Sequence, residues 1–245
     1  MLGILLSRPR WAPRYNGAMR LSIVIPALNE SGNIVATLTP LQSMRSRCAE
    51  VILVDGGSSD ATTQLAAPLV DCVVTARKGR ALQMNAGAAA ATGDILLFLH
   101  ADSILPSGAD QLILDGLQSD TRVWGRFDIS IEGRHFFLPV VAWCMNFRSR
   151  LTGMATGDQG LFMTVEAFSQ AGGFANIPLM EDLALCAALR KGGPPICLRQ
   201  KISTSGRRWE KHGVWRTILL MWRLRLAYFF GADPGDLHRA YYGAK

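Results

Sequence analysis

The chain has 245 residues, 49% of them hydrophobic and 18% charged, which is enough for one large α/β domain with a buried core. This composition, without low-complexity stretches, excludes a disordered or fibrous protein. The five cysteines show no CxxC spacing, which excludes a disulfide framework and a structural zinc site and favours a cytoplasmic protein.

The net charge of +7 is concentrated near the C-terminal end of the chain. Basic residues cluster there with only Glu210 to oppose them: Arg199, Lys201, Arg207, Arg208, Lys211, Arg216, Arg223 and Arg225. Tryptophans are interleaved with them, so this segment suits a diphosphate or an anionic membrane surface. Since no nucleic-acid recognition module is visible elsewhere, we expect no nucleic-acid partner.

Residues 1–18 are expected to form a disordered extension. The apolar run at 2–6 is too short for an export signal and has no positive charge before it. Met19 stands two residues before the first predicted strand, so translation starts either at Met1 or at Met19. The mass of the native protein distinguishes these starts.

The first hundred residues alternate between strands and helices. Short apolar runs at 21–25, 51–54, 72–75 and 95–99 predict buried parallel strands. Helices are predicted from Asn33 to about residue 45, from Ser58 or Ser59 to Pro68, and over about 80–91. This order predicts an α/β fold with an open, mostly parallel, Rossmann-like sheet flanked by helices.

The second half is less regular. Strands are predicted at 124–131 and 160–164, and helices at 136–151, 183–189 and 214–230. The longest apolar run of the last helix, residues 218–222, is too short to span a bilayer. That helix therefore either packs on the domain or lies against a membrane surface.

Polar residues follow three predicted strands, at 26–30, 55–60 and 100–102. Ligands of such sheets bind at the carboxyl ends of the strands, so these segments should face one crevice. At 55–60, Asp55 can accept hydrogen bonds from a nucleotide, or Ser58 and Asp60 merely cap the next helix. Asp102 can hold Mg²⁺ or Mn²⁺, or cap the following segment, and His100 is expected to be a packed or supporting side chain.

Two further segments carry charges at predicted helix starts. Lys78 and Arg80 form either an anion site at the helix beginning near residue 80 or a solvated basic turn. Glu181 and Asp182 complement the dipole of their helix, or one of them is a general base that takes a proton from an acceptor hydroxyl.

Together these segments resemble a known family. The sequences at 22–30, 54–60 and 99–102 match successive signatures of family 2 glycosyltransferases, which have the GT-A fold. Those at 79–88, 157–160 and 178–182 resemble a bacterial subgroup often labelled as associated with arsenosugar biosynthesis and with radical-SAM selenodomain proteins. The resemblance covers nearly all of the chain from residue 21 onward.

The resemblance implies a single GT-A domain over 19–245. Its nucleotide-binding half is expected at about 20–103, its acceptor half at about 104–212, and a C-terminal helix at about 213–231. The implied reaction transfers a sugar from a nucleoside-diphosphate sugar to an unidentified small-molecule or lipid hydroxyl, with inversion. The protein is expected in the cytoplasm, either free or at the inner face of the membrane.

The resemblance also implies roles for individual residues. Glu30 and Asp55 hold the nucleoside, Asp102 binds the divalent cation, and Asp182 is the base with Glu181 beside it. The acceptor side contains Gly157, Asp158 and Gln159. The full donor site is expected to comprise Pro26, Ala27, Asn29, Glu30, Asp55, Gly56, Ser58, Asp60, Lys78, Arg80, Asn85, His100, Ala101, Arg207, Arg208 and Trp209.

The sequence departs from the family pattern at two positions. Ser205 stands where processive relatives have glutamine in their QxxRW segment, so a non-processive enzyme is expected. His100 replaces the first acid of the usual acid-x-acid motif, which puts metal dependence in question. His212 is either an additional metal ligand or, as we favour, a solvent-facing side chain.

Two other functions compete with this interpretation. A nucleotidyltransferase would need a glycine-rich, arginine-containing loop after the first strand, and residues 26–30 are not such a loop. A catalytically silent nucleotide- or membrane-binding module remains the alternative, although the presence of Asp55, Asp102 and Asp182 together argues against it.

Overall fold

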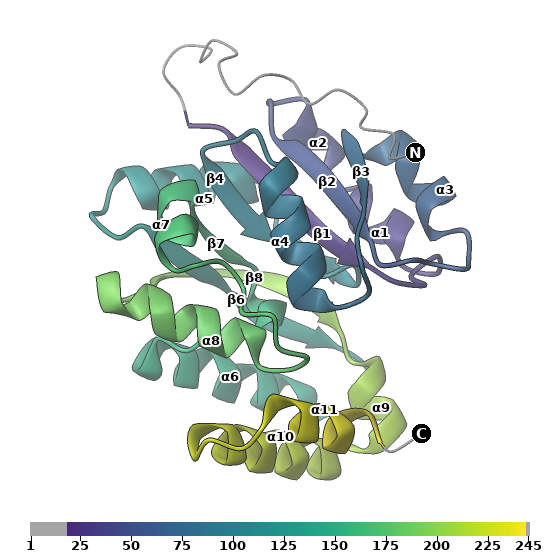
Figure 1. The fold of residues 1–245 in the computed structure, drawn as a ribbon, viewed down its shortest axis with the longest axis vertical. Coiled ribbons are helices and arrows are strands. Elements are labelled where there is room, and N and C mark those ends of the chain that lie inside the picture. The colour runs from purple at the N-terminus through teal and green to yellow at the C-terminus, as the bar shows by residue number, and fades with distance from the viewer. Residues whose placement is uncertain (1–18, 244–245) are drawn as a thin grey trace.

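A computed structural model of the chain describes residues 19–243, so the predicted extension at 1–18 lies outside the described residues. An eight-stranded sheet runs through it in the order β3-β2-β1-β4-β7-β6-β8-β5 (Figure 1). The strands are β1 Leu21–Ala27, β2 Glu50–Asp55, β3 Cys72–Thr75, β4 Ile95–Phe98, β5 Ser103–Ile104, β6 Trp124–Glu132, β7 Leu161–Thr164 and β8 Ile196–Ser205.

The first four strands confirm the predicted parallel half of the sheet. Strands β3, β2, β1 and β4 are neighbours and all pair in parallel. Their side chains alternate between two cores, with Ile23 and Ile25 on one face of β1 and Val24 on the other. Burial on both faces explains why these strands are continuous apolar runs rather than alternating patterns.

The other half of the sheet mixes parallel and antiparallel pairs, so the prediction of a mostly parallel sheet is confirmed only in part. Strand β7 is antiparallel to both β4 and β6, and β5 is antiparallel to β8. Strand β8, which pairs in parallel with β6, was not predicted. Its sequence is largely polar and partly exposed, so it lacks the apolar run by which a buried strand is recognised.

Helices cover both faces of the sheet and continue beyond it. They are α1 Ile34–Leu38, α2 Gln42–Arg45, α3 Thr62–Ala66, α4 Arg80–Ala90, α5 Ala109–Gln118, α6 Leu138–Thr152, α7 Val165–Gln170, α8 Glu181–Leu189, α9 Arg207–His212, α10 Val214–Phe229 and α11 Pro234–Tyr242, with short 3₁₀ turns η1 Ala67–Leu69, η2 Gly157–Gln159 and η3 Arg190–Gly192. The single helix predicted from Asn33 to residue 45 is wrong. It is divided into α1 and α2 around Pro40, which has no N–H to continue a helix.

The helices α6, α8, α10 and α11 gather at the end of the molecule away from β3 (Figure 1). Helix α10 matches the helix predicted at 214–230, whereas α5, α7, α9 and α11 were not predicted. Among the helices of residues 19–243, none is long and apolar enough to cross a membrane.

Helix α4 packs unusually closely on β1 and β2. A Cβ atom at Gly87 would lie 2.3 Å from Val24 Cγ1 and 2.8 Å from Val54 Cγ2, so only glycine fits there. By contrast, a Cβ at Gly116 of α5 would meet its nearest neighbour, Ile196 Cγ2, at 3.5 Å, which is ordinary contact.

The same substitution at these two glycines should therefore change stability in opposite directions. Gly87→Ala is expected to lower the free energy of unfolding by about 1–3 kcal/mol through overpacking. Gly116→Ala is expected to raise it by about 0.5–1 kcal/mol, because alanine loses less conformational freedom in a helix. Urea unfolding of both variants measures this, and equal effects would contradict the packing described.

Candidate active site

The loops after β1 and β2 are fastened to each other. The N–H of Asn29 donates to Ser58 Oγ (2.9 Å), and the N–H of Ser59 donates to Asn29 Oδ1 (2.8 Å). Asn29 adopts a left-handed backbone conformation, with φ of 54°, which asparagine tolerates better than most residues. The two predicted donor-site loops thus form one unit at the carboxyl edge of the sheet.

The carboxylates of Asp55 and Asp60 shape this unit. Asp55 is buried and accepts hydrogen bonds from the N–H groups of Gly57 (3.0 Å) and Ser58 (3.1 Å). Asp60 accepts from the N–H of Ser31 (3.1 Å) and from the N–H and hydroxyl of Thr62, the first residue of α3. The hydrogen bond from the Thr62 hydroxyl, with those from Ser31, holds the pKa of Asp60 well below its usual value. These bonds give Asp60 a structural role in the loop.

Gln83 is a supporting residue that the sequence did not single out by itself. It is buried on α4, and its Nε2 donates to the carbonyls of Ala27 and Val54, both at 2.9 Å. A Cβ at Gly56 would lie 3.0 Å from the same amide, so glycine makes room for it. A glutamine on the buried face of an alanine-rich helix was the available signal.

The carboxylates of Glu30 and Asp102 both lie near the guanidinium of Arg207. Arg207 Nη2 lies 3.2 Å from Asp102 Oδ2 and 3.6 Å from Glu30 Oε2, while its Nε donates to Ser205 Oγ (3.1 Å). These residues come from three distant parts of the sequence. Arg207 therefore balances Glu30, which is predicted for the donor site, and Asp102, which is the predicted metal ligand, and Ser205 orients it.

The predicted metal ligand Asp102 can supply only part of a metal site. Residues 19–243 contain no group of three His, Cys, Asp or Glu side chains that could hold a metal ion. His212 is exposed at the end of α9 and borders a separate small cavity of about 190 Å³. One carboxylate fits Mg²⁺ or Mn²⁺ only together with oxygens of a bound diphosphate and water, which is how Mg²⁺ is often held.

His100 joins the two halves of the site. Its Nδ1 lies 2.9 Å from Asp158 Oδ1, across a separation of 58 positions in the chain. Its Nε2 is buried without a hydrogen-bond partner among the described residues, and a Cβ at Gly157 would lie 2.5 Å from it. Although burial opposes ionisation of Asp158, the hydrogen bond and charge of His100 hold the pKa of that carboxyl below its usual value. His100 thus positions the turn at 157–159.

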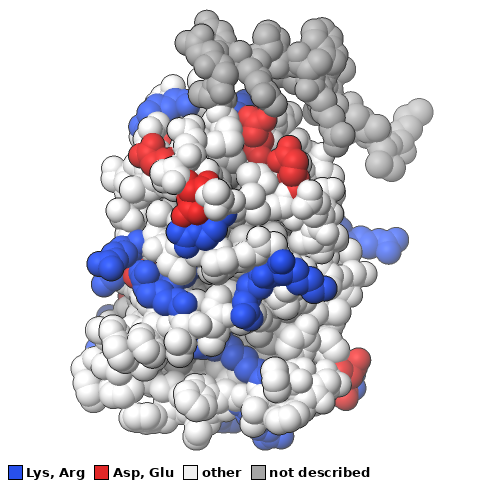
Figure 2. Space-filling view, turned by 90° about the vertical axis from the view of Figure 1, so that its left-hand side faces the viewer, with Lys and Arg blue, Asp and Glu red and all other residues white. Residues whose placement is uncertain are grey.

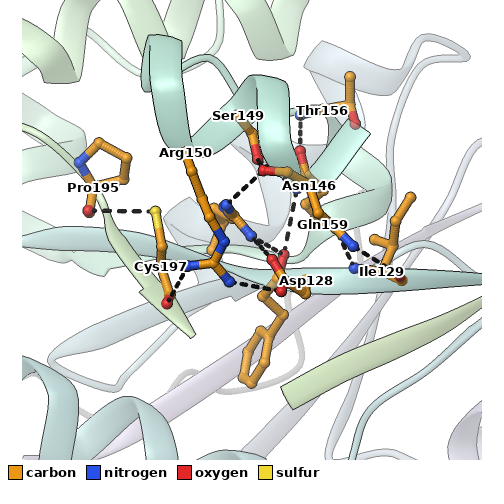
Figure 3. A network of polar contacts seen from close by, with 11 residues as sticks. Asp128, Ile129, Asn146, Ser149, Arg150, Thr156, Gln159, Pro195 and Cys197 are labelled. Carbon is orange, nitrogen blue, oxygen red and sulfur yellow. Dashed lines mark hydrogen bonds and ion pairs between the residues drawn. The ribbon is translucent and has the colours of Figure 1, made fainter. Parts of the chain in front are cut away.

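A buried polar network holds the same turn from below (Figure 3). Gln159 is fully buried; its Nε2 donates to Ser149 Oγ (3.0 Å), and its Oε1 accepts from the N–H of Thr156 (3.2 Å). Beside it, the carboxylate of Asp128 pairs with both Arg126 and Arg150. Gln159 therefore supports the turn from the interior, while Gly157 and Asp158 face the cavity described below.

The acid pair Glu181–Asp182 begins α8. The carboxylate of Asp182 accepts from the N–H of Gly157 (2.9 Å) and of Leu183 (2.7 Å), and Glu181 is buried 3.8 Å from Arg80 Nη1. Burial raises the pKa of both carboxyls, and Asp182 raises that of Glu181 further, while Arg80 acts in the opposite direction on both. A carboxylate with a raised pKa has the properties of a general base.

Met180 directly precedes this acid pair and sets the backbone conformation at the start of α8. Its φ of 71° places it in the left-handed region, which costs a non-glycine residue roughly 1–2 kcal/mol. Its buried side chain packs in a cluster with Leu183, Leu224 of α10 and Leu237 of α11. The packing of the C-terminal helices thus stabilises the strained start of α8.

One large cavity lies beside these groups. It measures about 910 Å³, and its polar end is formed by Arg80, His100, Gly157, Asp158, Glu181 and Asp182. It continues between α6 and α10 along mostly apolar side chains. Arg208 and Trp209 also border it, and the guanidinium of Arg208 lies 3.5 Å from the ring centre of Tyr241 in α11.

Several predicted donor-site residues lie outside the cavity lining. Lys78 is exposed in the loop before α4, and the side chain of Asn85 is bonded to the backbone of Phe174. Ala27 and Ala101 are buried, and the Ala101 carbonyl accepts from the Thr37 hydroxyl. Pro26, in β1, is half-buried. The charged residues of the predicted site therefore lie together at the carboxyl edge of the sheet, around Arg207. Residues such as Asn85 and Ala101 make structural contacts behind them.

Comparison with known proteins agrees with this architecture. The family model described as "Glycosyl transferase family 2" matches residues 22–169. An uncharacterized glycosyltransferase of Nostoc sp. (strain PCC 7120) is 29% identical over 108 residues, which are 41% of this chain and 34% of the relative. The match thus spans about a third of that relative's length.

Solved structures share the fold at low identity. A mannosyltransferase from Pyrobaculum calidifontis, in complex with GDP-Man and Mn²⁺, is 20% identical with a TM-score of 0.64, covering 94% of this chain and 71% of that one. TarS of S. aureus is 15% identical with a TM-score of 0.62, covering 77% and 61%. Glucosyl-3-phosphoglycerate synthase from Mycobacterium tuberculosis, with Mn²⁺ and UDP, is 21% identical with a TM-score of 0.54, covering 76% and 71%.

The family match covers more than half of the chain, and the fold of the chain matches the GT-A fold of these solved structures. The arsenosugar-associated subgroup stays a prediction. The chain belongs to glycosyl transferase family 2.

Proposed function

We propose that this chain transfers a sugar from a nucleoside-diphosphate sugar to an acceptor hydroxyl, with inversion and without processivity. The observation that carries the proposal is the position of Asp182. Its carboxylate is held by two backbone N–H groups at the border between the charged sheet edge and the large cavity. A base at such a border can reach an acceptor in the cavity while the donor lies on the sheet edge.

The proposed step is a direct displacement. The acceptor oxygen attacks the anomeric carbon, its proton passes to the Asp182 carboxylate, and the bond from that carbon to the diphosphate breaks, the diphosphate leaving with the electron pair. Attack from the opposite side of the leaving group inverts the configuration. The raised pKa of Asp182 suits it to accept this proton.

Arg207 and Asp102 are proposed to serve the diphosphate. Arg207, which balances Glu30 and Asp102, can turn one of its donors to a phosphate oxygen. A divalent cation held by Asp102 and the diphosphate would neutralise charge on the leaving group. The Mn²⁺ in two proteins of the same fold supports this proposal.

The donor can be identified by a thermal-shift screen against UDP, GDP, CDP, dTDP and their sugar conjugates, with and without Mn²⁺. One diphosphate should raise the melting temperature in a metal-dependent way. At a concentration 100 times its dissociation constant, a ligand raises the free energy of unfolding by about 2.7 kcal/mol. Asp102→Asn should abolish the metal-dependent part, whereas Asp115→Asn on the exposed side of α5 should keep it. No shift with any nucleotide would contradict the proposal.

Removal of the base should slow transfer without weakening the donor site. Asp182→Asn is expected to lower kcat by about 10²- to 10⁴-fold, the usual contribution of a general base, and to leave the nucleotide thermal shift intact. Glu166→Gln, an exposed exchange on α7, is the matched control. Release of nucleoside diphosphate measures the rate, and binding of nucleotide without any release would indicate a silent module instead.

The pH dependence should report the same carboxyl pair. Because a protonated carboxyl cannot accept the proton, kcat/KM should fall as pH decreases through an apparent pKa above the ordinary values of 3.8 and 4.5. Arg80 lowers both pKa values through its positive charge, so Arg80→Gln should move this acid limb to higher pH. An unchanged limb in Arg80→Gln would show that another group sets the profile.

A further inference from the structure

Two exposed apolar stripes border the large cavity. On α6, residues Val140, Trp143, Phe147 and Leu151 recur at helical spacing and are 43–76% exposed. On α10, the same holds for Trp215, Leu219, Trp222, Leu226 and Phe229, which are 60–82% exposed. Single exposed apolar residues are ordinary, but two parallel stripes along one cavity indicate an apolar partner.

Most of the α10 stripe and the first residue of the α6 stripe also line that cavity. Val140 of α6 and Leu219, Trp222, Leu226 and Phe229 of α10 line it directly. These lining side chains therefore face both the cavity and the solvent at its mouth. An elongated apolar ligand could enter between α6 and α10 and reach the acid pair along a mostly apolar wall.

A partly buried cation lies in the lining of this cavity. Arg148 of α6 lines it, and its Nε and Nη2 atoms are buried without a hydrogen-bond partner among the described residues. Burial lowers the pKa of Arg148, while the nearby charge of Asp182 acts in the opposite direction. Buried guanidinium nitrogens without a hydrogen-bond partner are costly, and an acidic group on a ligand would satisfy them.

The surroundings of the cavity mouth are basic. Neither α6 nor α10 contains an acidic residue, and Arg223 and Arg225 of α10 line the cavity. Figure 2 shows blue basic side chains standing among uncharged ones over the lower half of one face, with red acidic side chains mostly above. Apolar stripes framed by arginines suit a lipid surface with negative head groups.

We propose that the acceptor is a membrane lipid with an acidic head group, whose chain lies between α6 and α10 and whose acidic group pairs with Arg148. The α6 and α10 stripes then rest on the surface of a bilayer containing such lipids. This inference rests on the proposed function, because it places a hydroxyl of the same head group beside Asp182.

Dodecyl phosphate, below its critical micelle concentration, tests the site without any nucleotide. Calorimetry should show it binding at least about tenfold more tightly than inorganic phosphate, which lacks the chain, or dodecyl maltoside, which lacks the charge. Arg148→Met should weaken dodecyl phosphate binding about tenfold or more and leave the melting temperature equal or higher, since it removes buried nitrogens that have no hydrogen-bond partner among the described residues. Arg199→Gln, an exposed exchange on β8, should bind like the unaltered protein.

Alkylation of cysteines locates the bound molecule. Cys144 lines the cavity, whereas Cys48 and Cys72 are exposed elsewhere. Dodecyl phosphate should slow the reaction of Cys144 with iodoacetamide and leave the other two unchanged. Binding that is insensitive to Arg148→Met, or no protection of Cys144, would overturn the proposal.

Vesicle flotation tests the surface. The protein should float with phosphatidylglycerol vesicles and not with pure phosphatidylcholine vesicles, and Trp222→Ser should reduce flotation several-fold, whereas Leu65→Ser on α3 should not. A protein that is a dimer in solution, and that Trp222→Ser converts to a monomer, would show instead that a second copy covers the stripes.

These outcomes are independent of the donor. Nucleotide thermal shifts without dodecyl phosphate binding would leave the transferase proposal standing and refute the lipid acceptor. Arg148-dependent binding of dodecyl phosphate without any nucleotide shift would refute the transferase proposal and retain the lipid site.

Discussion

The turn at Gly157–Gln159 is the constraint on which the rest of the site depends. Its first N–H holds the carboxylate of Asp182, its second residue pairs with His100, and its third is bonded inside a buried network. A shift of this turn would move all three at once. Because buried polar groups must keep their partners, such a network has few alternative arrangements and fixes the acid pair relative to the sheet edge.

The site distributes its acids between two cations. Arg207 balances Glu30 and Asp102, and Arg80 acts on the Glu181–Asp182 pair. The first group is partly exposed, so water screens it and its ion pairs are exchangeable. The second group is more buried, which raises the pKa of its carboxyls. This division suits the proposed reaction, in which the donor carries negative charge and the acceptor hydroxyl loses a proton.

The C-terminal helices line the cavity and also stabilise the segment that carries the proposed base. Met180 adopts its unfavourable backbone conformation against Leu224 and Leu237, which belong to α10 and α11. Arg208 is stacked on Tyr241 of α11. Helix α10 therefore both forms an apolar wall of the cavity and supports the segment that carries Asp182.

The sequence by itself determined the first half of the sheet, its polar strand ends and the family. Apolar runs bounded by turn residues specify buried parallel strands locally, and such strands must end at one edge. Only the tertiary structure decided which side chains meet there: His100 with Asp158, and Asp102 with Arg207. The tertiary structure also decided that two nitrogens of Arg148 are buried without a partner among the described residues, and that a cavity lies between α6 and α10. The physical reason is that these contacts join segments that are far apart in the chain. They depend on mixed strand pairing and on polar strands such as β8, and a local hydrophobic pattern encodes neither of these.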